Sequence, residues 1–119
     1  MVYVFLANGF ETVEALACVD VLRRAGIETV TVGIESKTIN SSQNIKVICD
    51  KAEDEISVLD DVEGIVLPGG MPGTKNLDKS VVVNTFIDFA IENGLLVAAI
   101  CAAPSVLGKR GLLSGKKAT

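Results

Sequence analysis

The feature that most constrains the fold is a set of short apolar runs that alternate with helical patterns. Residues 1–7 (MVYVFLA) and 95–100 (LLVAAI) are uninterrupted apolar runs, and residues 63–67 (EGIVL) form a third. Runs of this length are typical of strands buried on both faces of a parallel sheet. Helical segments lie between them, so the sequence predicts an α/β chain with a doubly wound, mostly parallel sheet and helices on both faces.

Two segments carry the periodicity of amphipathic helices. Residues 80–93 begin with Ser80, a good N-cap, and continue with apolar residues at helical spacing. A second helix is predicted over residues 11–25, ending at Gly26. The side of that helix expected to face the sheet consists of Val13, Leu16, Ala17, Val21 and Ala25.

The middle of the chain is more polar. The pattern of residues 28–34 (ETVTVGI) predicts a second strand, and the polar, turn-rich segment 35–44 is expected to form a loop or a short hairpin. Residues 45–49 alternate weakly and predict an edge strand. The acidic segment 51–61 is interpreted as a solvated connection with one helical turn near residues 56–59.

Length and charge limit the possible functions. The chain has 119 residues, enough for a single domain over residues 1–119, and its formal net charge is −4. This charge argues against nucleic acid or an anionic membrane as a partner. No apolar run reaches membrane-spanning length and no signal peptide is evident, so a cytoplasmic protein is expected.

The cysteines do not predict a disulfide framework or a metal site. Cys18, Cys49 and Cys101 are an odd number, widely spaced, without a CxxC pair, and the chain contains no histidine. We therefore expect no metal. A catalytic Cys–His pair would need a histidine from outside this chain.

Cys101 is the strongest candidate for a reactive group. It follows the strand at 95–100 directly and precedes a helix near residues 103–109, with Pro104 in the first turn. This position puts the sulfur at the carboxyl edge of the sheet, beside N–H groups that favour a thiolate. The pattern indicates a nucleophile elbow with cysteine in place of serine. A buried structural thiol is the alternative.

Two other turns are expected at the same edge of the sheet. One contains Glu14, a carboxyl set among apolar neighbours in the first helix, and the other contains Gly69 and Gly70. With Ala102, these glycines can offer backbone N–H groups to an oxyanion, although Gly69–Gly70 could also be a plain tight turn. No GxGxxG or P-loop pattern is present, so we expect no nucleotide cofactor. A thiol, a carboxyl and N–H donors together predict a nucleophile with a proton partner.

Four collinear segments resemble the ThiJ/PfpI superfamily. They are 6–14 (LANGFETVE), 20–26 (DVLRRAG), 66–70 (VLPGG) and 98–104 (AAICAAP). The likeness is greatest to the branch of the bacterial YajL-type proteins and the human parkinsonism-associated protein deglycase. The resemblance implies a flavodoxin-like sandwich, similar to that of class I glutamine amidotransferases.

The resemblance also implies roles for individual residues. Cys101 matches the reactive cysteine of the family, and Glu14 matches the carboxyl that hydrogen-bonds its sulfur. Gly70 and Ala102 match positions whose N–H groups form an anion pocket. Cys49 matches a second, less reactive cysteine near the dimer contact, so a homodimer is expected; a half-buried strand cysteine is the alternative for Cys49.

Two functions follow from the resemblance. The first is cofactor-independent glyoxalase III or deglycase chemistry on methylglyoxal and related small aldehydes. The second is redox sensing, as an oxidative-stress protein or chaperone, through oxidation of Cys101. A PfpI-type peptidase is disfavoured because Ala102 stands where those enzymes carry histidine. An amidotransferase is disfavoured because Ala99 and Ala103 replace the usual glycines.

The sequence departs from the family at its C-terminal end. Family chains continue through another strand with a histidine near the site, a Gly-Pro-Gly segment and closing helices. The last residues here, 112–119, have the pattern of a turn that enters a strand. The expectation is a cut near residue 119, with the C-terminal part either lost or present as a separate chain.

Overall fold

The computed structural model describes residues 1–116. Its strands are β1 (Val2–Leu6), β2 (Thr29–Gly33), β3 (Thr38–Asn40), β4 (Lys46–Ile48), β5 (Lys51–Ala52), β6 (Gly64–Leu67) and β7 (Leu96–Ala99). Its helices are α1 (Thr12–Arg24), α2 (Gly73–Asp78), α3 (Val81–Glu92), α4 (Pro104–Gly108) and a 3₁₀ turn at Glu53–Glu55. Among the helices of this part of the chain, none is long and apolar enough to span a bilayer.

The central sheet is parallel throughout, as predicted. Its five strands lie in the order β5-β2-β1-β6-β7, while β3 and β4 form a separate antiparallel hairpin. β1 is central and pairs with β2 and β6, and β6 continues the sheet to β7. The predicted doubly wound α/β class is confirmed, because the carboxyl ends of all five strands meet at one edge.

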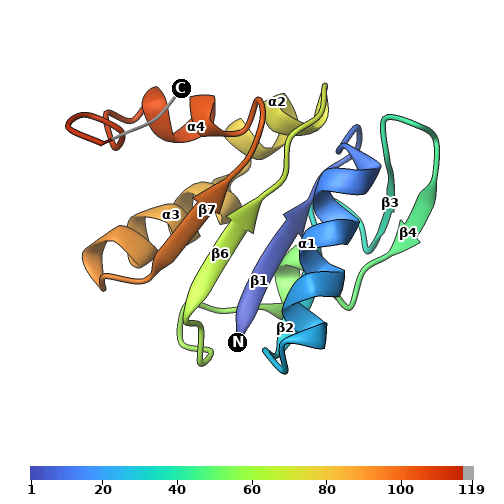
Figure 1. Cartoon of the computed structure of the whole chain (residues 1–119), viewed down its shortest axis with the longest axis horizontal. Coiled ribbons are helices and arrows are strands. Elements are labelled where there is room, and N and C mark those ends of the chain that lie inside the picture. Colours follow the sequence, from blue (N-terminus) through green and yellow to red (C-terminus); the bar gives the residue numbers. More distant parts are fainter. Residues whose placement is uncertain (117–119) are drawn as a thin grey trace.

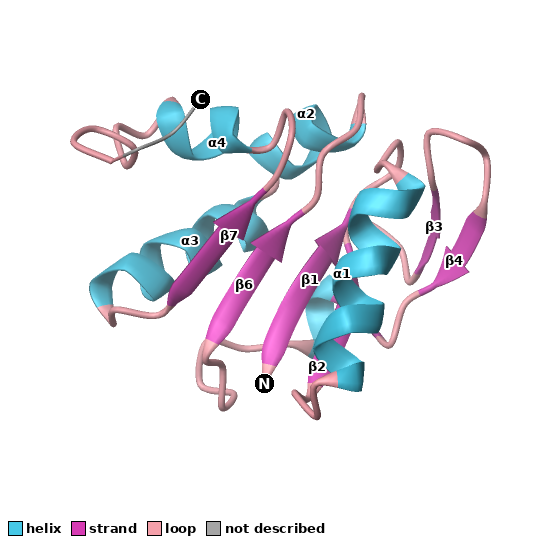
Figure 2. Cartoon of the chain, in the orientation of Figure 1, coloured by secondary structure: helices cyan, strands magenta, loops and turns pink. Residues whose placement is uncertain are grey.

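Helices cover both faces of this sheet. α1 and the β3–β4 hairpin pack on one face, over Val4, Leu6 and their neighbours. α2, α3 and α4 pack on the other face, around Phe5 and Leu67. Figures 1 and 2 show that α2 and α4 lie near the carboxyl ends of the strands, where the loops after β6 and β7 leave the sheet. Strand order thus brings these two loops together.

The predicted helix starts are confirmed at α3 and α4. Ser80 Oγ accepts a hydrogen bond from the N–H of Val83, which satisfies one of the free donors at the start of α3. Pro104 stands in the first turn of α4, where its missing N–H leaves no hydrogen bond unmade.

The predicted sheet-facing side of α1 is wrong. Val13 and Val21 are 70% and 64% exposed, whereas Ala15 and Val19 are buried against the sheet. Residues 15, 19 and 22 have helical spacing as well, so periodicity could not choose between the two apolar stripes of this helix. The stripe of Val13, Ala17 and Val21 faces outward instead.

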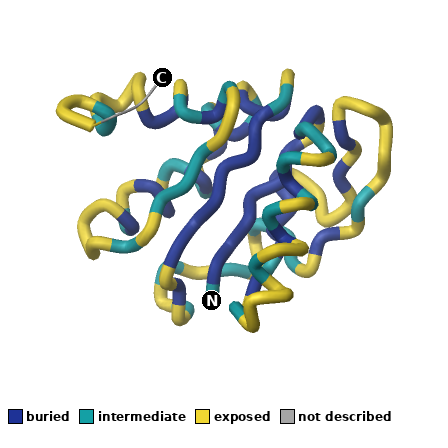
Figure 3. The backbone as a smooth tube through the Cα atoms, in the orientation of Figure 1, coloured by how far each residue is buried: buried dark blue, intermediate teal, exposed yellow. Residues whose placement is uncertain are grey.

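β7 is less buried than predicted. Figure 3 shows β1 and β6 as fully buried strands and β7 as an intermediate one, with Leu96 60% exposed. The reason is its position: β7 is one of the two edge strands of the sheet over residues 1–116. Two strands of equal apolarity can therefore differ in burial when one lies at the edge.

The polar middle of the chain agrees only in part with the sequence prediction. A hairpin is present, but residues 35–44 contain only its first strand, because β3 pairs with β4 beyond them. The edge strand expected at 45–49 is part of that hairpin and not of the main sheet, whose two edges over residues 1–116 are β5 and β7. The helical turn lies at Glu53–Glu55 and not at 56–59. Residues 111–116 form turns, and the rest of the strand expected near 112–119 lies outside the described residues.

Candidate functional site

Cys101 lies on the turn between β7 and α4. Its backbone is in the left-handed region, with φ 58°, which is uncommon for a residue other than glycine. Hydrogen bonds fix the turn on both sides, from Ile100 N–H to Leu67 C=O (3.2 Å) and from Ala103 N–H to Ile100 C=O (3.0 Å). The residue is exposed. The elbow geometry expected from the sequence is therefore present, and the buried structural thiol is excluded.

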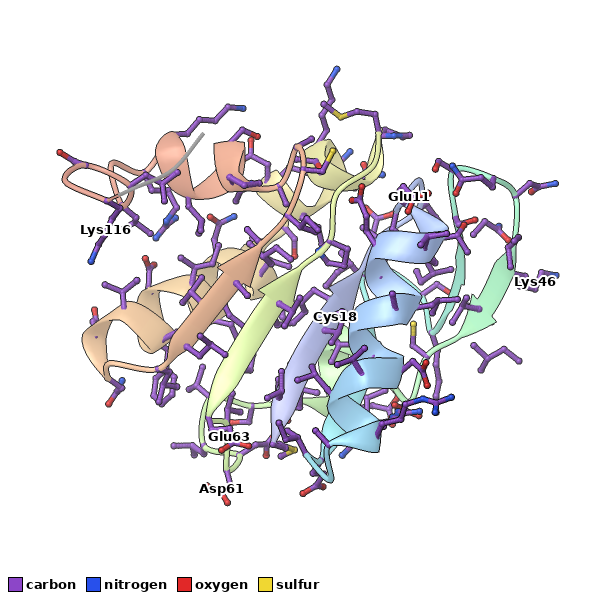
Figure 4. All side chains as sticks on the ribbon, viewed as in Figure 1. Glu11, Cys18, Lys46, Asp61, Glu63 and Lys116 are labelled. Atoms are coloured by element: carbon purple, nitrogen blue, oxygen red, sulfur yellow. The ribbon has the colours of Figure 1, made fainter. Side chains whose placement is uncertain are left out.

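Glu14 is held in the first turn of α1. Its N–H donates to the Glu11 carboxylate (2.8 Å), so Glu11 acts as the N-cap of the helix. Glu11 in turn donates its N–H to Gly69 C=O (2.9 Å), which ties the start of α1 to the loop after β6. Figure 4 shows Glu11 at this carboxyl end of the sheet.

Gly69 lies between Glu14 and Cys101. A methyl group placed on Gly69 would lie 2.5 Å from Glu14 Oε1 and 2.8 Å from Cys101 Cβ, so the two residues are neighbours across this glycine. Glu14 Oε1 is buried and has no hydrogen-bond partner within residues 1–116. An unpartnered carboxyl oxygen is thus held beside the turn that carries the thiol, which is unusual for a buried polar atom.

Backbone donors border the same turn. Within residues 1–116, the N–H groups of Gly69, Gly70 and Ala102 donate to no protein acceptor. Gly70 has φ 98°, and a side chain there would collide with Glu11 N at 2.4 Å, so the backbone conformation and the close packing both require glycine. The structure places all five predicted site residues at one edge of the sheet.

An open depression adjoins Cys101 on the side of α4. Met71, Ala102, Pro104, Ser105 and Leu113 line it, and none of these side chains carries a charge. The Ser105 hydroxyl donates to Ala102 C=O (2.7 Å). The surface next to the thiol is therefore mostly apolar.

The other two cysteines are in different surroundings. Cys49 is buried, and this burial raises the pKa of its thiol to about 11. Burial also raises the pKa of Cys18. Both thiols remain protonated at neutral pH, so they are poor nucleophiles compared with an exposed thiol.

A charged network lies beside Cys49. Burial acts to raise the pKa of Asp50, but hydrogen bonds from the Thr31 N–H and hydroxyl, together with Arg23, hold it below its usual range. This network joins the end of β4 to β2 and α1.

One contact at the site has no signal in the sequence. Gln43, in the β3–β4 hairpin, accepts hydrogen bonds from both the N–H and the hydroxyl of Thr12 at the start of α1. A glutamine in a polar turn is ordinary, and only the fold brings it next to a helix 31 residues away.

Within residues 1–116, no group of three or more metal-ligating side chains lies close enough to hold an ion.

The sequence profile of the DJ-1/PfpI family matches residues 1–119 of this chain. The chain belongs to the DJ-1/PfpI family. Protein dj-1beta of Drosophila melanogaster is 37% identical over 117 residues, which cover 98% of this chain and 62% of that protein. The chain therefore spans less than two thirds of the length of this relative.

Two further DJ-1/PfpI relatives bear on the fold and the site. The structure of oxidized Toxoplasma gondii DJ-1 superposes with a TM-score of 0.93 at 35% identity, covering 99% of this chain and 65% of that one. The glutathione-independent glyoxalase DJR-1.2 of Caenorhabditis elegans is 29% identical, over 87% of this chain and 55% of that protein. The resemblance seen in the sequence motifs is confirmed at the level of the family.

Proposed function

We propose that this protein converts methylglyoxal and related small 2-oxoaldehydes into hydroxy acids, with Cys101 as nucleophile and Glu14 as proton carrier. The observation that carries the proposal is the unpartnered Glu14 oxygen beside the exposed Cys101 turn, across Gly69. In this proposal the Cys101 sulfur attacks the substrate, and the Glu14 carboxyl carries the proton that the reaction moves. The name of the glyoxalase relative supports the same chemistry.

The proposed reaction needs no cofactor. The Cys101 thiolate adds to the aldehyde carbon, and the carbonyl oxygen takes the proton from Glu14, which gives a hemithioacetal. The Glu14 carboxylate then removes the proton from that carbon and returns it to the neighbouring ketone carbon, while the hydroxyl proton of the hemithioacetal moves to the former ketone oxygen. The product is a hydroxy-thioester, and water releases lactate and the thiol. N–H groups of Gly69, Gly70 and Ala102 stabilise the oxyanions on this path.

The depression beside Cys101 supports a neutral substrate. The uncharged residues that line it, including Met71 and Leu113, favour an aldehyde with a small apolar substituent over a phosphorylated one. Deglycation of early aldehyde adducts is a related reaction that the same thiol could perform.

The test is lactate formation from methylglyoxal by the purified protein. We expect turnover by the wild type and a loss of at least two orders of magnitude in Cys101→Ala and in Glu14→Gln. The matched control for the thiol is Cys18→Ala, which removes a half-buried cysteine on α1. Unchanged lactate production in Cys101→Ala or Glu14→Gln would falsify the enzymatic proposal.

A redox-sensing function is the second candidate, favoured by the exposure of Cys101. Two equivalents of a hydroperoxide would oxidise its thiolate first to a sulfenate and then to a sulfinate, each releasing the reduced alcohol or water. The oxidized state of the Toxoplasma relative supports this candidate.

Either function needs a free thiol, so we propose a cytoplasmic location, where thiols stay reduced.

We also propose that two copies associate through α1. The outward stripe of Val13, Ala17 and Val21 is apolar and uncovered. Val21→Asp should shift the sedimentation of the protein from dimer to monomer, whereas Val81→Asp, at an even more exposed valine on α3, should not. A wild type that sediments as a monomer at micromolar concentration would refute this association.

A further inference from the structure

The two loops that supply the candidate N–H donors each continue into a short helix. The loop with Gly69 and Gly70 leads into α2, and the turn with Cys101 and Ala102 leads into α4. The loops belong to neighbouring strands, β6 and β7. The separation of the donors therefore depends on how α2 and α4 are fixed relative to each other.

Asn84 of α3 joins the ends of these helices. Its amide nitrogen donates to Asp78 C=O at the end of α2 (2.8 Å) and to Ser80 C=O before α3 (2.8 Å). Its amide oxygen accepts from the guanidinium of Arg110, just after α4 (2.8 Å). One side chain thus uses both amide hydrogens and its oxygen to link three helices.

Arg110 completes this connection with a charge. Its guanidinium also pairs with Asp88, one turn after Asn84 on α3, and the Arg110 side chain is only 28% exposed. The preceding residue, Lys109, pairs with Asp78 of α2 at 3.1 Å. Charge-assisted hydrogen bonds are both strong and directional. They therefore fix the orientation of the end of α4 and also stabilise its contact with α2 and α3.

We propose that Asn84 and Arg110 are positioning residues, which set the distance between the Gly69–Gly70 loop and the Cys101–Ala102 turn. This inference rests on the proposed function, because it concerns the same thiol and the same donors. Neither residue touches the site. Each acts through a helix, and the effect reaches Cys101 through α4, whose buried Val106 and Leu107 make it a rigid connection.

The test is the pH profile for alkylation of Cys101 by iodoacetamide, followed for each cysteine by mass spectrometry. Asn84→Ala removes all three contacts of the amide and favours the helix. Asn93→Ala is the matched control, because Asn93 is the C-cap residue of α3 and, among residues 1–116, its amide side chain bonds the Phe89 carbonyl alone. Arg110→Lys keeps the charge but loses the forked geometry, so it provides a second variant.

We expect Asn84→Ala to raise the midpoint of the Cys101 profile by roughly 0.5 pH unit, an approximately threefold slower alkylation at neutral pH. Arg110→Lys should give a smaller rise, and Asn93→Ala none. If the wild-type and Asn84→Ala profiles coincide while the wild-type midpoint lies below that of a cysteine peptide, the inference about Asn84 and Arg110 is wrong. The proposed function would survive that result. A wild-type profile identical to that of a cysteine peptide would overturn both the inference and the thiolate of the proposed function.

Discussion

Substitution of Gly69 by alanine tests the geometry of the site with a single methyl group. The backbone of Gly69 is not in the left-handed region, so alanine introduces no backbone strain. The new methyl group would lie 2.5 Å from Glu14 Oε1, 2.8 Å from Cys101 Cβ and 2.9 Å from Ile100 O. All three distances are shorter than carbon contacts in folded proteins allow.

The three neighbours differ in their freedom to move. Cys101 Cβ and Ile100 O are fixed by the backbone of the turn, whereas Glu14 Oε1 is the end of a flexible side chain. The methyl group should therefore displace the Glu14 carboxyl, and the loop at Gly69 must also move away from the Cys101 turn. We expect overpacking to reduce the free energy of unfolding by about 1–3 kcal/mol. Loss of a positioned proton carrier should reduce methylglyoxal turnover on the order of 10²-fold.

Urea unfolding and lactate production measure the two effects separately. The control is Gly108→Ala, because the nearest atom to that methyl group is Leu113 Cδ1 at an ordinary 3.7 Å. Gly108 lies in α4, so alanine there should stabilise the protein by about 0.5–1 kcal/mol. Because Gly108 also borders the depression beside Cys101, this variant is the control for the unfolding measurement and not for turnover. If folded Gly69→Ala turns over methylglyoxal at the wild-type rate, the spacing of Glu14 and Cys101 has no role in the chemistry.

The surroundings of the second cysteine yield two further predictions. The pKa of Asp50 is lower in the folded protein than its usual value. The Asp50 carboxylate therefore stabilises the fold at pH values above the usual aspartate pKa of about 3.9. This stabilisation is lost as the pH falls through the pKa of the folded protein. At neutral pH the wild type should therefore unfold at a higher urea concentration than Asp50→Asn, and in acid this difference should disappear. A difference that persists at pH ~2 would contradict the lowered pKa of Asp50. Because burial raises the pKa of Cys49 to about 11, iodoacetamide at neutral pH should label Cys101 well before Cys49, and equal rates would contradict the buried environment.

The sequence was sufficient for the parts of the fold that depend on local patterns. The apolar runs predict β1, β6 and β7, and Ser80 predicts the start of α3, because strand formation and helix capping depend on a few neighbouring residues. The placement of Cys101 on a strand-to-helix turn followed in the same way. Where two patterns were equally regular, as on α1, the sequence could not decide which of them faces the sheet.

The rest depends on contacts between distant segments. Nothing in the sequence near Gln43 indicates that it bonds the start of α1, and nothing near Asn84 indicates that it joins α2 and α4. The proximity of Glu14 to Cys101 is predicted because parallel strands share one carboxyl edge and because the family resemblance implies it. The close approach of both residues to Gly69 required the structure.

The most direct test of the account is a double-mutant cycle on methylglyoxal turnover. It compares kcat/KM for the wild type, Cys101→Ala, Glu14→Gln and the double variant, with circular dichroism to verify folding. If thiol and carboxyl act as one unit, either single substitution removes nearly all activity and the double variant is no slower than Cys101→Ala. Losses that simply multiply, or turnover that survives without Cys101, would contradict the claim that these two residues form the reactive centre.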